Sequence, residues 1–149
     1  MNLLTQEYRK DGYKMNKTIE QQRILDSFSV YSVPIIFKDL INEALNSNEW
    51  DWFKDCDGCT LVADYWTTKY HPACLVHDFL WVTGRGGKVS DLIFKDLSVI
   101  YGMPKYQAKF RFFAVRLGWV LYYKKHHAKK NNFRPHTPAM MRYIKLKNY

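Results

Sequence analysis

The sequence HPACLVHDFLWVTG, residues 71–84, decides the fold. Pro72 predicts a helix beginning here, because proline is favoured in the first turn of a helix. The helix runs through an apolar stretch and is expected to stop near Gly84, a residue common at helix ends. The adjacent pair His77 and Asp78 lies within this helix. We therefore place the centre of any chemistry at this pair.

A second helix is expected to pair with the first. The intervening turn, GRGGK at 84–88, is not a phosphate-binding loop, because it follows a helix and lacks the Walker spacing. Ser90 is a good N-cap for a helix over Asp91–Tyr101, and Gly102 suits the position just after its end. A third helix is expected over 104–117. The middle of the chain is thus predicted to be a helical hairpin with a further helix beside it.

The flanking regions carry weaker signals. Residues 27–37 alternate loosely and predict a strand or extended segment ending at Pro34, and 36–45 has a helical period. Residues 49–71 predict a long loop with turns, and such loops are usually functional. We expect a mainly α protein with few or no strands. Its expected regions are an N-terminal arm and helix over 1–48, a helical core over 49–130 and an exposed tail over 131–149.

Charge and aromatic content suggest partners. The 149 residues include 23 basic and 14 acidic side chains, a net charge of +9, which favours phosphate in lipid headgroups or nucleic acid, or an acidic protein. Trp66 and Trp81 are candidates for an interface with lipid, with ordinary packing as the alternative. The apolar residues of the third helix most simply form a core: Phe110, Phe112, Phe113, Val115, Leu117, Trp119 and Val120.

The expected compartment follows from segments that we do not find in the sequence. Its first residues have neither a basic segment nor a long apolar one, so we expect no secretory signal. The longest apolar runs are short and interrupted by charges, so we expect no transmembrane segment. Synthesis in a cytoplasm is therefore expected.

The acids around His77 suggest ester hydrolysis. Adjacent helical residues point about 100° apart, so Asp78 is poorly placed to orient the ring of His77. In an antiparallel hairpin Asp91 can approach that ring instead, and a histidine oriented by a carboxylate can act as a general base toward water. A cation could then polarise an ester carbonyl. The oxygen ligands for calcium would be Asp78, Asp64 and the loop at Asp57 and Gly58.

The ordered motifs resemble a known family. DGCT at 57–60, Asp64, PAC at 72–74 and HDF at 77–79 are similar to the bacterial and fungal type of secreted phospholipase A2. An uncharacterised phage-associated family has a similar order, with a DGA-type turn, PA..HD and AD..F. The resemblance covers roughly 57–118. Trp81 stands where these families usually have tyrosine.

The resemblance implies a fold and a site. The fold would be a phospholipase A2-like helical hairpin preceded by a long loop. His77 would be the general base, Asp91 its orienting partner, and Asp64 and Asp78 calcium ligands. Cys59 and Cys74 match a disulfide pair of the secreted enzymes, although a cytoplasm would keep both reduced. The phage-associated relatives imply a second possibility, a non-catalytic virion or tail component on the same fold, bound to other particle proteins.

Two further interpretations stay open. Cys56, Cys59, Cys74 and His77 have the types and spacing of a Cys3His zinc site, which with the net charge would suggest a nucleic-acid-binding protein. That site would leave Asp64, Asp78 and Asp91 without a role. A purely structural interpretation treats His77 as a packed helix residue and Asp91 as a favourable charge in the first turn of a helix.

Overall fold

The computed structural model describes residues 17–56, 70–118, 120–121 and 134–148. These residues form seven α-helices and no strand, which confirms the expected mainly α fold. The helices are α2 (Lys17–Val30), α3 (Ile35–Asn46), α4 (Trp52–Asp55), α5 (His71–Val82), α6 (Lys88–Ile100), α7 (Lys105–Gly118) and α10 (Pro138–Lys147).

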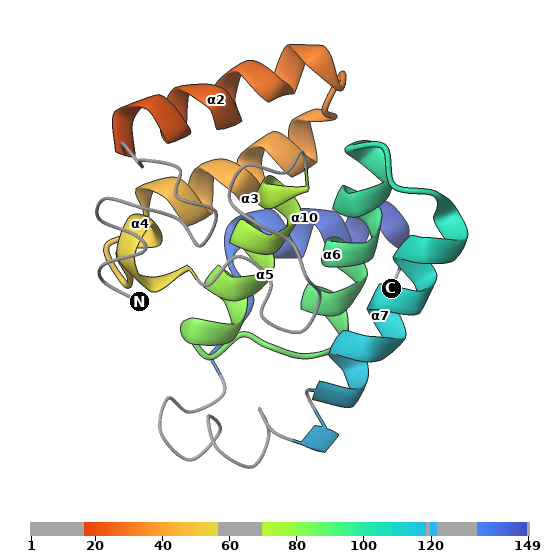
Figure 1. Ribbon diagram of the computed structural model, residues 1–149. Helices are drawn as coiled ribbons and strands as arrows, with labels where there is room; N and C mark the ends of the chain where they lie inside the picture. The colour runs from red at the N-terminus through yellow and green to blue at the C-terminus, as the bar shows by residue number, and fades with distance from the viewer. Residues whose placement is uncertain (1–16, 57–69, 119, 122–133, 149) are drawn as a thin grey trace.

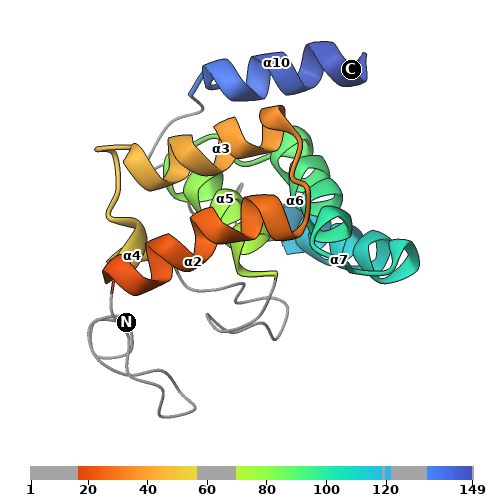
Figure 2. The same ribbon diagram turned by 90° about the horizontal axis from the view of Figure 1, so that it is seen from above.

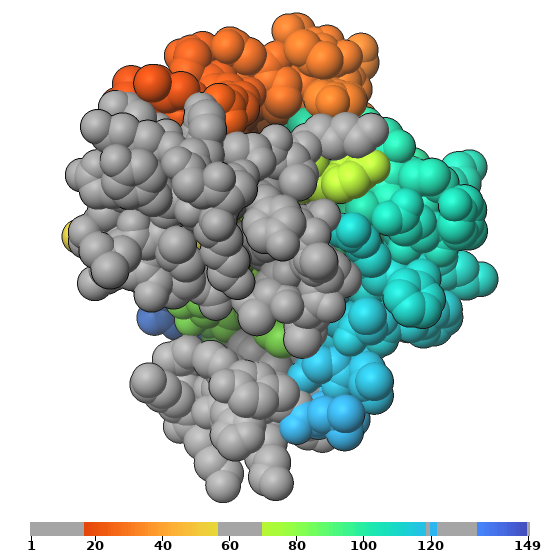
Figure 3. Space-filling model, in the orientation of Figure 1, coloured from red at the N-terminus to blue at the C-terminus, as the bar shows by residue number. Residues whose placement is uncertain are grey.

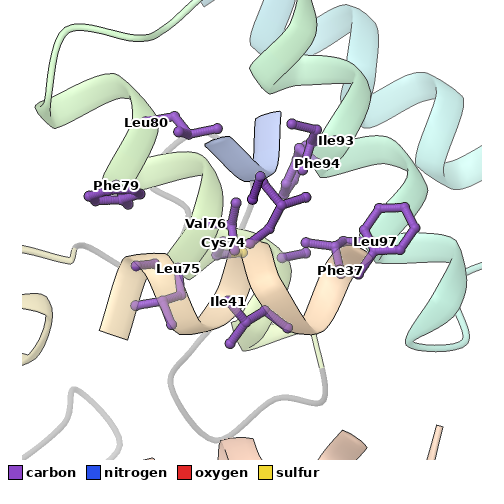
Figure 4. Packing of buried hydrophobic residues seen from close by; sticks show 14 of the residues in the cluster. Phe37, Ile41, Cys74, Leu75, Val76, Phe79, Leu80, Ile93, Phe94 and Leu97 are labelled. Atoms are coloured by element: carbon purple, nitrogen blue, oxygen red, sulfur yellow. The ribbon is translucent and has the colours of Figure 1, made fainter. Parts of the chain in front are cut away.

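Helix α5 lies at the centre of the molecule (Figure 1). Its apolar residues from Pro72 to Leu80 are buried on all sides, as expected for a helix without a wide polar face, and Val82 at its end is exposed. It packs against α3 on one side and α6 on the other, and α7 packs against α6. Figure 4 shows side chains of α3, α5 and α6 converging in one core, among them Ile41, Val76 and Ile93. The core therefore surrounds the helix that carries His77.

The predicted hairpin is present. Pro72 lies in the first turn of α5, and Gly84 follows the helix end with a φ of 81°, a conformation that glycine adopts without steric cost. Gly102 follows α6 in the same way, with a φ of 95°. The prediction that Ser90 caps α6 is wrong, because the helix begins at Lys88 and its N-cap is Gly87. Ser90 instead accepts a hydrogen bond from the Gly87 amide at 3.0 Å.

The predicted strand over 27–37 is wrong. Residues 17–30 form α2, and a short turn leads through Pro34 into α3. The alternating apolar residues fall partly on the buried side of this helix pair: Val33 is 4% exposed, and the ring of Tyr31 lies 4.8 Å from that of Tyr101. Burial raises the pKa of the Tyr101 phenol to about 12, and its hydroxyl lies 2.7 Å from the Ser27 hydroxyl. Packing against the rest of the protein has outweighed the weak preference of residues 27–37 for an extended conformation.

Residues 134–148, predicted to be an exposed tail, are largely exposed but include a helix with one buried face. Helix α10 packs along α3 (Figure 2). Its residues Ala139, Met140 and Tyr143 are fully buried. The Tyr143 hydroxyl donates a hydrogen bond to Asp96 at 2.6 Å, which ties α10 to α6. The buried cluster of the described residues therefore runs from Ile24 on α2 to Tyr143 on α10.

The start of α10 offers a test of this docking. Thr137 is its N-cap: the hydroxyl oxygen accepts from the Met140 amide at 3.1 Å and donates to Glu43 on α3 at 2.6 Å. We expect Thr137→Ala to lower the free energy of unfolding by about 1–2 kcal/mol, because both bonds are lost. Urea unfolding measures this change. Lys145→Ala, at an exposed position of the same helix, is the control and should change stability little. Equal effects of the two substitutions would contradict the assigned role of Thr137.

None of the helices in the described part of the chain combines the length and apolar character needed to cross a membrane.

Candidate functional site

The structure brings His77 and Asp91 together. Nε2 of His77 on α5 lies 2.7 Å from Oδ1 of Asp91 on α6. The two side chains are 7% and 0% exposed, so water competes little for this contact. The hairpin explains the approach: α5 and α6 are neighbours, and Asp91 lies in the first turn of α6, a short distance after the connecting turn. Asp91 therefore contacts the ring of His77, as the sequence predicted.

The hydrogen bond fixes which ring nitrogen is available for chemistry. An ionised carboxylate can only accept, so in the tautomer that this contact favours Nε2 of His77 donates a hydrogen bond to Asp91. In a neutral imidazole the other nitrogen, Nδ1, is then the proton acceptor. A histidine held in one tautomer by a buried carboxylate has the geometry that general-base chemistry requires.

Arg116 completes the contacts of Asp91. Its Nη1 on α7 lies 3.0 Å from Oδ2 of Asp91, the oxygen that His77 does not contact. The guanidinium offsets the negative charge that Asp91 carries into the core, where an unpaired carboxylate is costly. Three helices thus meet at one carboxylate, and sequence analysis did not name Arg116. The available signal was a single charge within the otherwise apolar run FFAVRL at 112–117.

Two aromatic rings enclose His77. The ring centroids of Trp81 and Phe94 lie 4.8 Å and 4.9 Å from that of the imidazole. Trp81 is one turn after His77 on α5, and Phe94 is one turn after Asp91 on α6, so helical spacing places both rings beside the pair. They restrict the rotation of the imidazole. Trp81, suggested from the sequence as a lipid-interface residue, is partly buried and contacts His77; Trp66 lies outside the described residues.

Asp78 faces a different neighbour from His77. The thiol of Cys56 lies 3.4 Å from Oδ2 of Asp78, and Cys56 is fully buried while Asp78 is partly exposed. As expected from helical geometry, Asp78 and His77 contact different partners, Cys56 and Asp91. A carboxylate at this position is of the type that calcium prefers.

The expected calcium ligands other than Asp78 come from the segment before α5. Asp57, Gly58 and Asp64 lie outside the described residues. Among the residues that the structure does describe, no group of three or more histidine, cysteine or acidic side chains is arranged to hold a metal ion. Asp78 alone would therefore need ligands from the 57–69 segment to bind calcium.

The described part of the zinc set is not assembled. Cys74 is disulfide-bonded, whereas Cys56 carries a thiol, which lies beside Asp78. A disulfide sulfur has no thiolate to donate to zinc, and Nε2 of His77 is engaged by Asp91. Cys59 lies outside the described residues. The disulfide at Cys74 agrees with what the resemblance implied for that residue.

Comparisons of this chain with protein-family models, with curated protein sequences and with solved structures returned no match.

Proposed function

We propose that the protein hydrolyses a carboxylic ester of a phospholipid, with His77 as the general base. The observation that supports this most directly is the 2.7 Å hydrogen bond between Nε2 of His77 and Asp91 in a nearly buried setting. Such a bond holds the ring in one direction and, with Nε2 as its donor, leaves Nδ1 as the nitrogen that can accept a proton, the two properties that a base needs. The resemblance to phospholipase A2 supplies the substrate class.

The proposed reaction uses this pair in a simple way. Nδ1 of His77 takes a proton from a water molecule while the water oxygen attacks the ester carbonyl carbon. The bond from that carbon to the alcohol oxygen then breaks, and the proton on Nδ1 passes to the departing oxygen. The products are a fatty acid and a lysophospholipid. Asp91 stabilises the imidazolium formed on the way, and Arg116 keeps Asp91 in position through its second oxygen.

Calcium is part of this proposal. It would be held by Asp78 together with Asp57, Gly58 and Asp64, and would stabilise the negative charge that develops on the carbonyl oxygen. The partly exposed carboxylate of Asp78, adjacent in sequence to the base, suits this position.

The test is fatty-acid release from mixed phospholipid vesicles. We expect wild-type protein to release fatty acid with calcium present. Removing calcium with EGTA should lower the rate by about 10²-fold or more, because loss of one stabilising group for a developing oxyanion has effects of this size. Restoring calcium should restore the rate, and magnesium should not. Wild-type protein that releases no fatty acid in calcium would refute the enzymatic proposal and leave a non-catalytic component, such as a virion protein, on the same fold.

A further inference from the structure

Helix α7 exposes a row of large apolar side chains. The fraction of each side chain exposed is 79% for Tyr106, 74% for Phe110, 59% for Phe113 and 58% for Leu117. We call these four residues the α7 stripe. The sequence predicted Phe110, Phe113 and Leu117 to lie in the core, and for these three residues, as for Val120 just after the helix, that prediction is wrong. Only part of the helix faces the core, chiefly Ala108 and Val115.

The α7 stripe forms one continuous face. Its members are spaced by four, three and four residues, so they follow one another along one side of the helix. Ala108 and Val115 lie on the opposite side, which packs toward α6. Figure 3 shows α7, in cyan, at the outer surface of the molecule. Scattered apolar residues are normal on a protein surface, but an aligned row that includes two phenylalanines marks an interaction site.

The charges on α7 indicate what covers the stripe. The helix, KYQAKFRFFAVRLG, contains four basic residues and no acidic one. Lys105 and Lys109 are exposed, and helical spacing puts them along one border of the stripe. Two copies of this face would bring lysines against lysines, so charge opposes pairing of the protein with itself. A surface that is anionic outside and apolar inside can accept both the apolar stripe and the lysines beside it.

We propose that the α7 stripe is the surface by which this protein docks onto an anionic phospholipid bilayer. The aromatic and aliphatic side chains would enter the boundary between headgroups and acyl chains, with Lys105 and Lys109 against the phosphates. The inference rests on the proposed function, because it names the surface on which the substrate would lie. Arg116 links the two: it contacts Asp91 and directly precedes Leu117 of the stripe, so docking and catalysis would involve one helix.

The experiment measures binding separately from hydrolysis. The His77→Gln variant is used as the parent, so that catalysis cannot alter the lipid. Its co-sedimentation is measured with vesicles of equimolar phosphatidylglycerol and phosphatidylcholine and with vesicles of phosphatidylcholine alone. We expect binding to the anionic vesicles, weakened by high salt. Phe110→Ser with Phe113→Ser should lower the partition coefficient by about tenfold or more, since two exposed aromatic side chains no longer enter the lipid. Lys105→Glu with Lys109→Glu should reduce the preference for phosphatidylglycerol.

A matched control removes apolar residues from another exposed face. Met141 and Leu146 on α10 are 58% and 64% exposed, so Met141→Ser with Leu146→Ser makes a comparable change away from α7. This control should bind as the parent does.

The proposal is overturned if the parent does not bind anionic vesicles, or if Phe110→Ser with Phe113→Ser binds as well as Met141→Ser with Leu146→Ser. Light scattering in the absence of lipid provides another check: a dimer that Phe110→Ser with Phe113→Ser dissociates would identify a second copy as the partner. Vesicle binding without fatty-acid release from wild-type protein would refute the enzyme and leave the docking surface standing.

Discussion

Replacing Asp91 with alanine is expected to lower the free energy of unfolding by about 3 kcal/mol. The carboxylate is fully buried and contacts both His77 and Arg116. Removing one partner of a buried ion pair leaves the other charge without compensation, which typically costs 3–5 kcal/mol. We expect a cost at the lower end of this range, because the Arg116 side chain is 27% exposed and can regain some contact with water. For a chain of 149 residues this corresponds to a fall in Tm of about 10 °C.

Asp39→Ala is the matched control for this prediction. Asp39 also pairs with an arginine from another helix, Arg142, at 3.1 Å, but its side chain is 37% exposed. A pair that water reaches contributes about 0–1 kcal/mol, so this substitution should shift Tm by a few degrees at most. Differential scanning calorimetry measures the Tm of both variants and of the wild type. Similar small shifts for Asp91→Ala and Asp39→Ala would show that the buried contact adds no stability to the three-helix junction.

Replacing His77 with glutamine is expected to lower the rate of phospholipid hydrolysis by about 10³-fold. Glutamine retains a hydrogen-bond donor toward Asp91 but has no nitrogen that can accept a proton, and general bases typically contribute 10²–10⁴-fold. The loss should fall on kcat rather than KM, since the proposed role begins after substrate binding. The measurement is fatty-acid release at saturating calcium, beside circular dichroism to establish that the variant is folded.

A control for the histidine chemistry is His136→Gln. His136 is exposed and lies outside the hairpin, so its replacement should leave the rate unchanged. A folded His77→Gln protein that hydrolyses phospholipid at the rate of wild type would remove His77 from the mechanism. The remaining explanation of the His77–Asp91 contact would then be structural, as the link between α5 and α6.

Arg116 and α10 show what local patterns did not reveal. The role of Arg116 depends on where α7 crosses α6, a matter of tertiary packing that residue spacing within α7 does not encode. Residues 134–148 are rich in basic side chains, and their three fully buried residues, Ala139, Met140 and Tyr143, make too short an apolar pattern to predict a core helix. The docking of α10 depends instead on partners far away in the chain, such as Glu43, which accepts a hydrogen bond from the Ala139 amide at 3.2 Å.

The hairpin at the centre of the protein was readable from HPACLVHDFLWVTG and the residues that follow it. Pro72, Gly84 and Gly102 act through their own backbone preferences, so they mark helix ends whatever surrounds them. The position of Asp91 at the start of the second helix, across a glycine-rich turn, made its approach to His77 predictable for an antiparallel hairpin.

Which faces of the helices are covered was decided only by the tertiary structure. Periodicity shows that Tyr106, Phe110, Phe113 and Leu117 share one side of α7, but it does not show whether another element packs on that side. In the folded protein α6 covers the opposite side, where Ala108 and Val115 lie. The same packing brings Arg116 to Asp91 and leaves the α7 stripe at the surface, because one helix cannot bury all of its faces against a single neighbour.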